Sequence, residues 1–275
     1  QRQMCIRDSG RTILRLIPAT EGQVLYNGED ILTYDKKKMW EMRRKLQIIF
    51  QDPYSSLNPR MTVYDLISAP LEVYKVGTKE ERREMVEEIL QEVGLDKQYL
   101  NRFPHEFSGG QRQRIGIARA LILNPEFVVC DEAVSALDVS VRAQVLNLMR
   151  NMQQKKNLTY LFISHDLSVV RHISDRIAVM YLGSVAEVAE KAQLYSNPMH
   201  PYTKALLSAI PIPDPDVEKN RQRIMLEGTL PNPIDLGEEC KFCSRCPVCK
   251  DSCHKSQPKL VEVKPGHFVA CSQVQ

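Results

Sequence analysis

Acidic and imidazole side chains stand at the ends of two apolar runs of this sequence. Asp131 and Glu132 directly follow the run FVVC, and His165 follows the run LFIS. Such runs are typical of buried strands, and in open α/β sheets ligands bind at the carboxyl ends of the strands. Taken singly, an Asp-Glu pair there is typical of helix capping and a lone histidine of a structural role. We expect all three side chains at one edge of the sheet.

A pair of glycines opens a helical segment upstream of these residues. Ser108 is suited to cap this helix, and Gly109 and Gly110 allow backbone amides to approach a ligand closely. A helix N-terminus carries unpaired N–H groups and partial positive charge, so it suits a phosphate. Alone the motif is usually only a cap, but here QRQRIGIARAL follows it. The glycine pair, the carboxylates and the histidine, in this order, indicate one functional site.

Strands and helices alternate between Gly10 and Tyr195, which predicts an α/β domain. The apolar strand segments are GQVLY (22–26), LQIIF (46–50), EFVVC (126–130), TYLFI (159–163) and RIAVMYL (176–182). The Asn27-Gly28 pair is a hairpin turn signal, so the first of these strands belongs to an antiparallel element.

The strand pattern fades between Pro53 and Pro104. VYDLISAPLEVY and KEERREMVEEILQEVGL have apolar residues at helical spacing, and Gly94 is placed to end the second helix. The sequence therefore predicts a helical insertion inside the α/β core.

Composition narrows the class of protein. The 275 residues are 43% hydrophobic and 26% charged, as in a soluble globular protein, and the net charge of +3 is too small to indicate a nucleic-acid partner. No apolar run approaches the roughly 18–20 residues that a membrane span requires. Any role at a membrane is therefore expected to depend on a partner protein.

The stretch from Glu106 to Asp138 resembles the ATP-binding subunits of ABC transporters. FSGGQ is similar to their signature motif, FVVCDE to Walker B, SALD to the D-loop, FISHD to the switch-histidine segment and IIFQDPYSSLNPRMTV to the Q-loop. The form DPYSSLNPRMTV resembles the peptide-permease group in particular, the oligopeptide and dipeptide importers, and within it the F-type subunit. The resemblance implies a P-loop NTPase (RecA-like) α/β core with an inserted helical subdomain and a small Cys-rich C-terminal extension.

The resemblance also implies a role for each motif residue in ATP hydrolysis with Mg²⁺. Asp131 would hold Mg²⁺ through water, Glu132 would be the general base, and His165 would contact the γ-phosphate. Gln51 would sense the metal and the attacking water and touch the membrane subunits. The residues expected to bind a nucleotide held mainly by the opposite subunit are Ser108, Gly109, Gly110 and Gln111, with Asp138 bracing the dimer interface. Phosphoryl transfer depends on such positioning and charge neutralisation.

The same resemblance implies partners and a location. The chain is expected to pair with a related D-type ATP-binding subunit and with two transmembrane permease subunits, at the cytoplasmic face of the membrane. An extracytoplasmic peptide-binding protein would be an indirect partner. Import of oligopeptides or dipeptides is the expected function. The alternatives are a soluble ABC-type ATPase unconnected with transport and a non-catalytic fragment.

The family places a phosphate-binding loop, G-x-x-x-x-G-K-[ST], directly before the helix that begins GRTILRL. At that position this sequence reads QRQMCIRDS, without glycine, lysine or threonine. Residues 1–9 are therefore interpreted as foreign to a truncated domain whose Walker A motif is missing, and a natural divergent loop is the alternative. The expected consequence is a chain defective in its own nucleotide site.

Cysteines crowd the end of the sequence, where six of the eight follow residue 239. In the reducing cytosol expected for this chain, clustered thiols favour a metal over disulfides. Spacing alone selects the ferredoxin-type run of Cys243, Cys246, Cys249 and Cys253. The family resemblance instead implies Cys240, Cys246, Cys253 and Cys271 as ligands of a [4Fe–4S] cluster. Zn²⁺ on four of the six is the main alternative, and free thiols are the third.

The change to a proline-rich and cysteine-rich sequence predicts a domain boundary near residues 196–200. We expect a nucleotide-binding domain over 1–197, with its helical subdomain at 53–122, and a C-terminal extension over 198–275.

Overall fold

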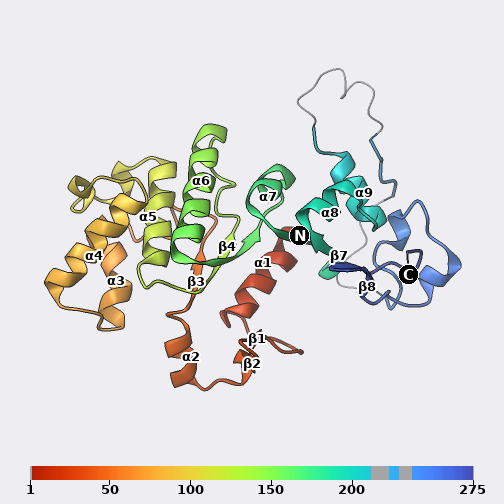
Figure 1. Ribbon diagram of the computed structural model, residues 1–275, viewed down its shortest axis with the longest axis horizontal. Coiled ribbons are helices and arrows are strands. Elements are labelled where there is room, and N and C mark those ends of the chain that lie inside the picture. The colour runs from red at the N-terminus through yellow and green to blue at the C-terminus, as the bar shows by residue number, and fades with distance from the viewer. Residues whose placement is uncertain (1, 212–222, 229–236, 275) are drawn as a thin grey trace. The chain divides into compact units, whose positions relative to one another are not determined.

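The computed structural model describes residues 2–211, 223–228 and 237–274 (Figure 1). The chain forms two compact units. We call residues 7–165 the N-terminal unit; the residues up to Ile6, together with those from Asp166 onward, are the C-terminal unit. The two units divide between His165 and Asp166, earlier in the chain than the domain boundary that composition predicted near residues 196–200. That domain boundary stays a prediction.

The sheet of the N-terminal unit has three parallel strands in the order β3-β4-β5. They are β3 (Leu46–Ile49), β4 (Phe127–Asp131) and β5 (Thr159–Ile163). The central strand β4 is almost wholly buried, which explains its continuous apolar sequence. All three lie where the apolar runs predicted them, and the α/β fold class is confirmed.

Helix α1 (Arg2–Ile13) packs closely on this sheet through Gly10. A Cβ at Gly10 would lie 2.9 Å from both Val129 Cγ1 and Ile163 Cδ1. In Figure 1, α5 and α6 lie to one side of β3 and β4, and α1 lies to the other. A side chain at this position would therefore require Val129 and Ile163 to shift.

The predicted hairpin is present but short. It joins β1 (Leu25–Tyr26) to β2 (Glu29–Asp30) through Asn27 and Gly28, whose φ angles are 50° and 85°. Two consecutive positive φ angles are what a tight two-residue hairpin turn requires.

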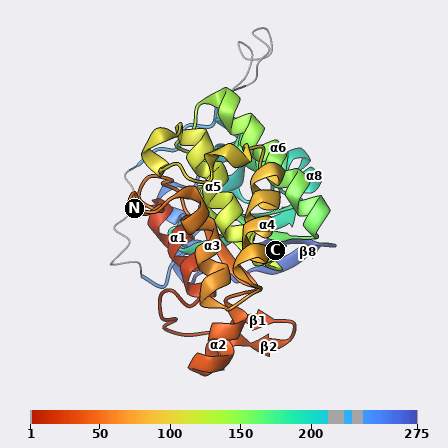
Figure 2. The same ribbon diagram turned by 90° about the vertical axis from the view of Figure 1, so that its left-hand side faces the viewer.

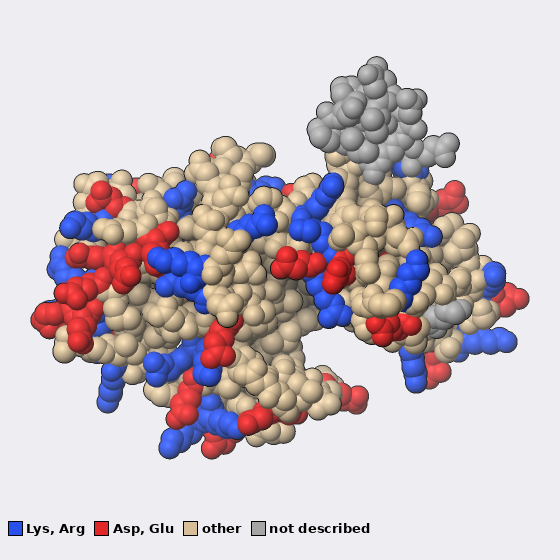
Figure 3. All heavy atoms as spheres, in the orientation of Figure 1, with Lys and Arg blue, Asp and Glu red and all other residues tan. Residues whose placement is uncertain are grey.

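The predicted helical insertion consists of α3 (Val63–Val73), α4 (Lys79–Glu92) and α5 (Gly109–Leu121), which pack on one another (Figure 2). Each begins with a capping box, in which side chain and backbone of the first turn bond reciprocally. Helix α4 buries Val86, Ile89 and Leu90, whereas its glutamates form the acidic area over this helix in Figure 3. Gly94 ends α4 with a φ of 72°, as predicted.

The C-terminal unit contains an antiparallel sheet in the order β6-β7-β9-β8. Its strands are β6 (Arg176–Tyr181), β7 (Ser184–Glu190), β8 (Val261–Lys264) and β9 (His267–Val269). Because β9 pairs with β7, the last part of the chain completes a sheet that begins far upstream. The sequence did not predict this pairing.

A buried carboxylate joins this sheet to the turn that precedes α9. Glu187 accepts hydrogen bonds from the backbone N–H groups of Met199 and His200, at 2.8 and 3.0 Å. Its Oε1 also lies 2.6 Å from Nε2 of His267 on β9. Glu187 and His267 are both at most 1% exposed. A buried charge needs such partners, so these contacts connect β7, β9 and the turn.

The remaining helices are α2 (Lys36–Met42), α6 (Val139–Lys156), α7 (Leu167–Ile173), α8 (Lys191–Ser196) and α9 (Pro201–Ser208). The 3-10 turns are η1 (Ile31–Thr33), η2 (Lys97–Tyr99), η3 (Pro104–Glu106), η4 (Cys243–Arg245) and η5 (Asp251–His254). Within the described ranges, no helix has the length and apolar character needed to cross a bilayer.

Candidate functional site

The polar residues predicted from the strand ends lie together in the N-terminal unit. Gln51 follows β3, Asp131 ends β4, Glu132 comes directly after it, and His165 follows β5. Since the three strands are parallel and adjacent, their carboxyl ends bring these side chains to one edge. We call these four residues the strand-end cluster.

Glu132 is the centre of this cluster. Its carboxylate is 3% exposed, lies 3.0 Å from Nδ1 of His165 and accepts a hydrogen bond from the side-chain amide of Gln51. Its backbone N–H donates to the carbonyl of Ile163 at 3.1 Å, and its φ of 49° is in the left-handed region. Such a φ is costly for a non-glycine residue and is concentrated at functional sites.

The cluster has the groups that metal-assisted hydrolysis requires. Two carboxylates and an amide supply the oxygen ligands that Mg²⁺ prefers. A carboxylate beside a histidine can orient and deprotonate a water molecule. The imidazole of His165 is 55% exposed, so it can reach a ligand outside the sheet edge while it contacts Glu132.

An arginine that sequence reasoning assigned to foreign sequence is part of the site. Arg7 Nε lies 3.1 Å from Asp131 Oδ1, and its Nη2 lies 2.6 Å from Gln51 Oε1 and 3.4 Å from Glu132 Oε2. Arg11 adds a second guanidinium, 3.5 Å from Asp131. The spacing of Arg7 and Arg11 is the signal that was available, because residues four apart share one face of a helix.

These contacts place positive charge where the family resemblance predicts Mg²⁺. Residues 2–9, which stand where the family has its phosphate-binding loop, belong to helix α1, and this helix extends to Ile13. The Arg7 guanidinium therefore balances part of the negative charge of Asp131 and Glu132, and Arg11 adds to this at Asp131. The carboxylates suit Mg²⁺ chemically, but a cation that binds them must displace or rearrange Arg7.

The predicted phosphate-binding helix tip is present at the start of α5. Ser108 Oγ accepts from the Gln111 N–H at 3.3 Å, and Gln111 Oε1 accepts from the Ser108 N–H at 3.0 Å. A Cβ at Gly110 would lie 2.3 Å from Val141 Cγ1 of α6, whereas one at Gly109 would be in ordinary contact with Leu137. Gly110 therefore has a packing role as well as the predicted ligand-binding role.

The D-loop connects the two parts of the predicted site along the chain. This loop, SALD at residues 135–138, follows Glu132 after two intervening residues. Its Leu137 lies beside the α5 tip, and its Asp138 precedes α6. Asp138 is exposed and, within the described chain, its side chain accepts no capping hydrogen bond from α6. Its carboxylate is thus accessible to another molecule.

The Q-loop is attached to the helical insertion by arginines of α5. The Arg112 guanidinium lies 3.8 Å from the centre of the Tyr54 ring, and Arg119 donates to the Ser56 carbonyl at 2.6 Å. Tyr54 is nevertheless 63% exposed. Sequence reasoning missed both arginines, although each lies on the helix that the signature motif begins.

Six cysteines of the C-terminal unit line one small pocket. Four of them have free thiols: Cys240, Cys246, Cys253 and Cys271. Burial raises the pKa of the Cys240, Cys246 and Cys271 thiols, and the charge of neighbouring thiolates raises it further. A hydrogen bond with Ser272 lowers the pKa of Cys253. These four thiols are the set that the family resemblance implied, and we call them the cysteine quartet.

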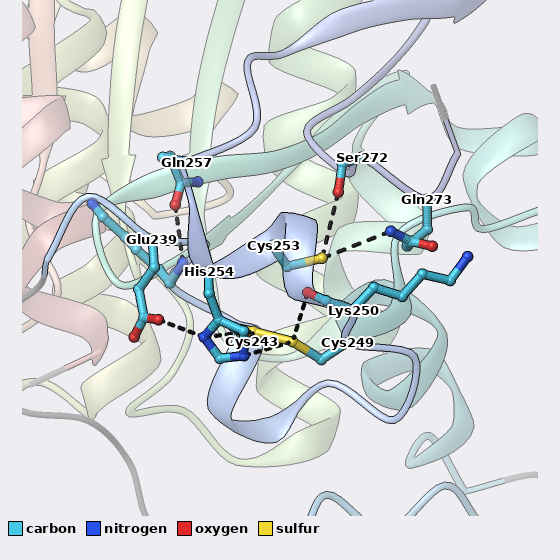
Figure 4. The surroundings of a disulfide bond; sticks show 10 residues. Glu239, Cys243, Cys249, Lys250, Cys253, His254, Gln257, Ser272 and Gln273 are labelled. Carbon is cyan, nitrogen blue, oxygen red and sulfur yellow. Dashed lines mark hydrogen bonds and ion pairs between the residues drawn. A yellow bond between two sulfur atoms is a disulfide. The ribbon is translucent and has the colours of Figure 1, made fainter.

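The remaining two cysteines of the pocket, Cys243 and Cys249, form a disulfide (Figure 4). The expectation that these thiols stay reduced did not anticipate this bond. While it is intact, the ferredoxin-type run cannot supply four thiolates, because two of its members are oxidised. The quartet remains complete.

Comparisons with known proteins agree with the motifs. Residues 10–135 match the family described as ABC transporter, and residues 186–253 match the oligopeptide/dipeptide transporter C-terminal region. The chain is 56% identical over 263 residues to the putative oligopeptide transport ATP-binding protein YkfD of Bacillus subtilis, covering 95% of this chain and 80% of that protein. The chain belongs to the oligopeptide/dipeptide branch of ABC transporter ATP-binding proteins.

Other relatives have names of the same kind. The oligopeptide transport ATP-binding proteins AppF and OppF of Bacillus subtilis are each 54% identical to this ABC protein. The alignment with AppF covers 96% of this chain and 80% of AppF, and that with OppF covers 97% and 82%. By family, the chain is an ATPase.

Solved structures support the same fold. The ATP-binding cassette MJ0796, in a dimeric post-hydrolysis state bound to ADP and Pi, is 29% identical to this ABC protein with a TM-score of 0.60. That alignment covers 67% of this chain and 79% of MJ0796. A second structure, cbiO1 from Clostridium perfringens, has a TM-score of 0.63 at 24% identity and covers 69% and 74%, which supports the fold alone.

Proposed function

We propose that this chain is the F-type ATP-binding subunit that drives import of oligopeptides or dipeptides through an ABC transporter. The observation that carries the proposal is that the side chains of the strand-end cluster meet at Glu132, which is buried and has a φ angle in the left-handed region. The names of YkfD, AppF and OppF, which are oligopeptide transport proteins, support the class of cargo. The chain would act at the cytoplasmic face of the membrane, held there by its partners.

In this proposal the four residues of the cluster have separate tasks. Glu132 accepts a proton from the attacking water, and His165 contacts the γ-phosphate while it orients the Glu132 carboxylate. Asp131 would hold Mg²⁺, which would neutralise the charge of the phosphates. Gln51 links the metal site to the Q-loop, whose exposed Tyr54 is available to a permease subunit.

The nucleotide site that would use this cluster lacks its phosphate-binding loop in the sequence given. The residues before Gly10 supply neither the glycine-rich N–H cradle nor the lysine that meets the β- and γ-phosphates. We therefore infer that the chain binds ATP poorly by itself. Its α5 tip, Ser108–Gln111, would complete a nucleotide site on a D-type partner, with Asp138 bracing the interface.

The proposal also assigns a [4Fe–4S] cluster to the cysteine quartet, with Zn²⁺ as the alternative occupant. The four thiols line one pocket, and three of them, Cys240, Cys246 and Cys271, are unfavourable as thiolates without a cation, which supports a metal there. A metal would stabilise a segment that is poor in regular secondary structure. An absorbance spectrum separates the two, because iron–thiolate centres are coloured and zinc–thiolate centres are not.

Nucleotide titration tests the central claim. The chain as given is compared with a chain in which residues 1–9 are replaced by a segment ending in a G-x-x-x-x-G-K-[ST] loop. We expect Mg-ATP to bind the second at micromolar concentration and the first at least about a hundredfold more weakly, since the loop supplies several charge-assisted hydrogen bonds. Micromolar binding by the chain as given would contradict the defective site.

Co-expression tests the transport assignment. The chain is expressed with a D-type subunit and two permease subunits, and an affinity tag on a permease is used for purification. Recovery of this chain in the complex supports the proposal. A chain that stays outside the complex and hydrolyses no ATP would support the non-catalytic alternative instead.

A further inference from the structure

A second group of metal-binding atoms lies beside the cysteine quartet and is separate from it. It consists of the sulfurs of Cys243 and Cys249 and a ring nitrogen of His254, all within 4.8 Å of one another. His254 Nε2 lies 3.4 Å from Cys243 Sγ and 3.7 Å from Cys249 Sγ. Figure 4 shows the imidazole directed at the two sulfurs.

We propose that Cys243, Cys249 and His254, when the disulfide is reduced, form a Zn²⁺ site controlled by the redox state of the two cysteines. Two thiolates and an imidazole are ligands typical of zinc, which takes sulfur and nitrogen donors in a tetrahedral arrangement. Water or a carboxylate can supply the fourth ligand. The quartet does not share any of these three residues.

A carboxylate orients the imidazole in the way found at zinc sites. Glu239 Oε2 lies 2.9 Å from His254 Nδ1, on the ring nitrogen opposite the one nearest Cys243. Zinc-binding histidines usually donate their second N–H to such a carboxylate, which selects the tautomer and increases ligand basicity. Glu239 is therefore a positioning residue for the proposed site.

The backbone holds the three ligands in place by bonds other than the disulfide. Cys243 begins η4 and His254 ends η5, and each of these turns has its own backbone hydrogen bonds. The Cys249 N–H donates to the Cys246 carbonyl at 3.2 Å, and the Cys240 N–H donates to the Cys253 carbonyl at 2.9 Å. The ligands thus remain near one another after reduction.

The exposure of the ligands allows exchange with solvent. Cys243 is buried and Cys249 is half-buried, whereas the His254 side chain is 59% exposed. A metal ion can therefore enter from the His254 side. The same opening admits a reductant to the disulfide.

The redox step balances with a dithiol as reductant. The dithiol transfers two electrons and two protons to the disulfide, so Cys243 and Cys249 become thiols and the dithiol becomes a disulfide. Binding of Zn²⁺ then releases the two thiol protons to solvent. A small-molecule disulfide reverses the sequence: it accepts two electrons from the two thiolates and two protons from solvent and becomes a dithiol, while Cys243 and Cys249 form their disulfide and release the metal.

Zinc counting tests the proposal on the whole chain with its quartet intact. The protein is reduced with a dithiol, desalted without oxygen and titrated with Zn²⁺ against a chromophoric chelator. We expect one more equivalent of zinc in the wild type than in Cys243→Ser/Cys249→Ser. Cys5→Ser, which removes a thiol belonging to neither group, is the matched control and should bind as the wild type does. An equal zinc count in the double variant and the wild type would overturn the proposal.

Alkylation of the wild type gives a test that does not depend on folding of a variant. The reduced chain is treated with a maleimide with and without Zn²⁺, and modified peptides are mapped by mass spectrometry. We expect zinc to protect Cys243 and Cys249 and the oxidised chain to bind no metal at this site. Glu239→Gln should weaken this zinc about tenfold or more while the two thiols remain protectable at saturation. Unprotected Cys243 and Cys249 at saturating zinc would overturn the assignment.

Discussion

In the N-terminal unit the reactive groups come from the ends of parallel strands that are far apart in sequence, and in the C-terminal unit they come from closely spaced turns. The adjacent strands β3, β4 and β5, of which β4 is almost wholly buried, hold the strand-end cluster through hydrogen bonds and apolar packing. Cys243 lies on the short 3-10 turn η4 and Cys253 on η5, while Cys240 and Cys246 pack against the apolar cluster that contains Phe242. The first site is therefore positioned by the ends of core strands, whereas the second is positioned by short turns that rest on a smaller apolar cluster.

The two sites also differ in how they balance charge. In the strand-end cluster, Arg7 and Arg11 supply an internal cation to the carboxylates. At the quartet, burial raises the pKa of Cys240, Cys246 and Cys271, and the charge of Lys204 opposes this only slightly at Cys271. A metal would thus compete with an existing ion pair at the first site, whereas at the second it would replace the protons of the thiols.

The largest expected effect tests whether the strand-end cluster is catalytic. In a chain with the phosphate loop restored and assembled with its partners, Glu132→Gln should reduce ATP turnover by about 10²–10⁴-fold, because the amide cannot accept the proton of water. Steady-state phosphate release measures this. The control is Glu126→Gln, at the opposite end of the same strand. Turnover within about twofold of the parent would exclude Glu132 as the general base.

A pH experiment tests the buried polar contacts of the C-terminal unit. Burial lowers the pKa of His200 to about 4, and the charge of Glu187 opposes this only partly. His200 is then neutral when folded but protonates near pH 6.5 when unfolded, so stability is lost as the pH falls from about 6.5 to 4. The loss should reach about 3 kcal/mol at the acidic limit, as measured by urea unfolding.

The variant His200→Asn should abolish most of this pH dependence. In the wild type, His200 Nδ1 accepts a hydrogen bond from the Tyr202 N–H at 3.0 Å. The side-chain oxygen of asparagine can still accept this hydrogen bond. His172→Asn, at an exposed histidine of α7, should leave the dependence unchanged. An unaltered pH profile in His200→Asn would show that another group titrates.

Two helical glycines test how tightly the helices of the N-terminal unit are packed around the sheet that holds the strand-end cluster. Gly10→Ala should lower the free energy of unfolding of the N-terminal unit by about 1–3 kcal/mol, because the new methyl group overlaps Val129 and Ile163. Gly116→Ala, where a Cβ meets no atom within 4 Å among the described residues, should instead increase it by about 0.5–1 kcal/mol. Thermal unfolding of both variants measures the difference. Equal effects would contradict the packing argument.

The smallest expected effect concerns the internal cation. Arg7→Ala should increase the affinity of the strand-end cluster for Mn²⁺, used as a paramagnetic substitute for Mg²⁺, by about tenfold, because Asp131 and Glu132 lose a competing charge. Arg11→Ala should have a smaller effect, since Arg11 is more exposed and contacts only Asp131 among these carboxylates. Mn²⁺ relaxation titration measures both. Unchanged affinity in Arg7→Ala would show that the guanidinium does not compete with a metal.

Local sequence patterns predicted much of the N-terminal unit. Apolar runs located β3, β4 and β5, the Asn27-Gly28 pair located a hairpin, and helical spacing located α3 and α4. These features depend on neighbours within a few residues, so they can be read from the chain. The residues at the strand ends followed, because parallel strands bring their carboxyl ends together.

Contacts between distant segments were not predicted. The pairing of β9 with β7 joins residues that no periodicity relates, and Arg7 reaches Asp131 across more than a hundred positions of sequence. Gly110 was assigned to ligand binding alone, although Val141 leaves no space for a side chain there. Each of these depends on how helices and strands pack, which spacing along the chain does not specify.

The sequence by itself determined which chemical groups this protein has and in what order: carboxylates and an imidazole after apolar runs, a glycine-flanked helix start and a dense set of cysteines. It also predicted that the strand-end residues meet. Only the tertiary structure decided the contacts that neither spacing nor the family resemblance indicated: it brought Arg7 to the carboxylates and joined Cys243 to Cys249 in a disulfide beside His254. The physical reason is that spacing limits how far a side chain can reach, whereas turns and packing select one partner among several within that reach.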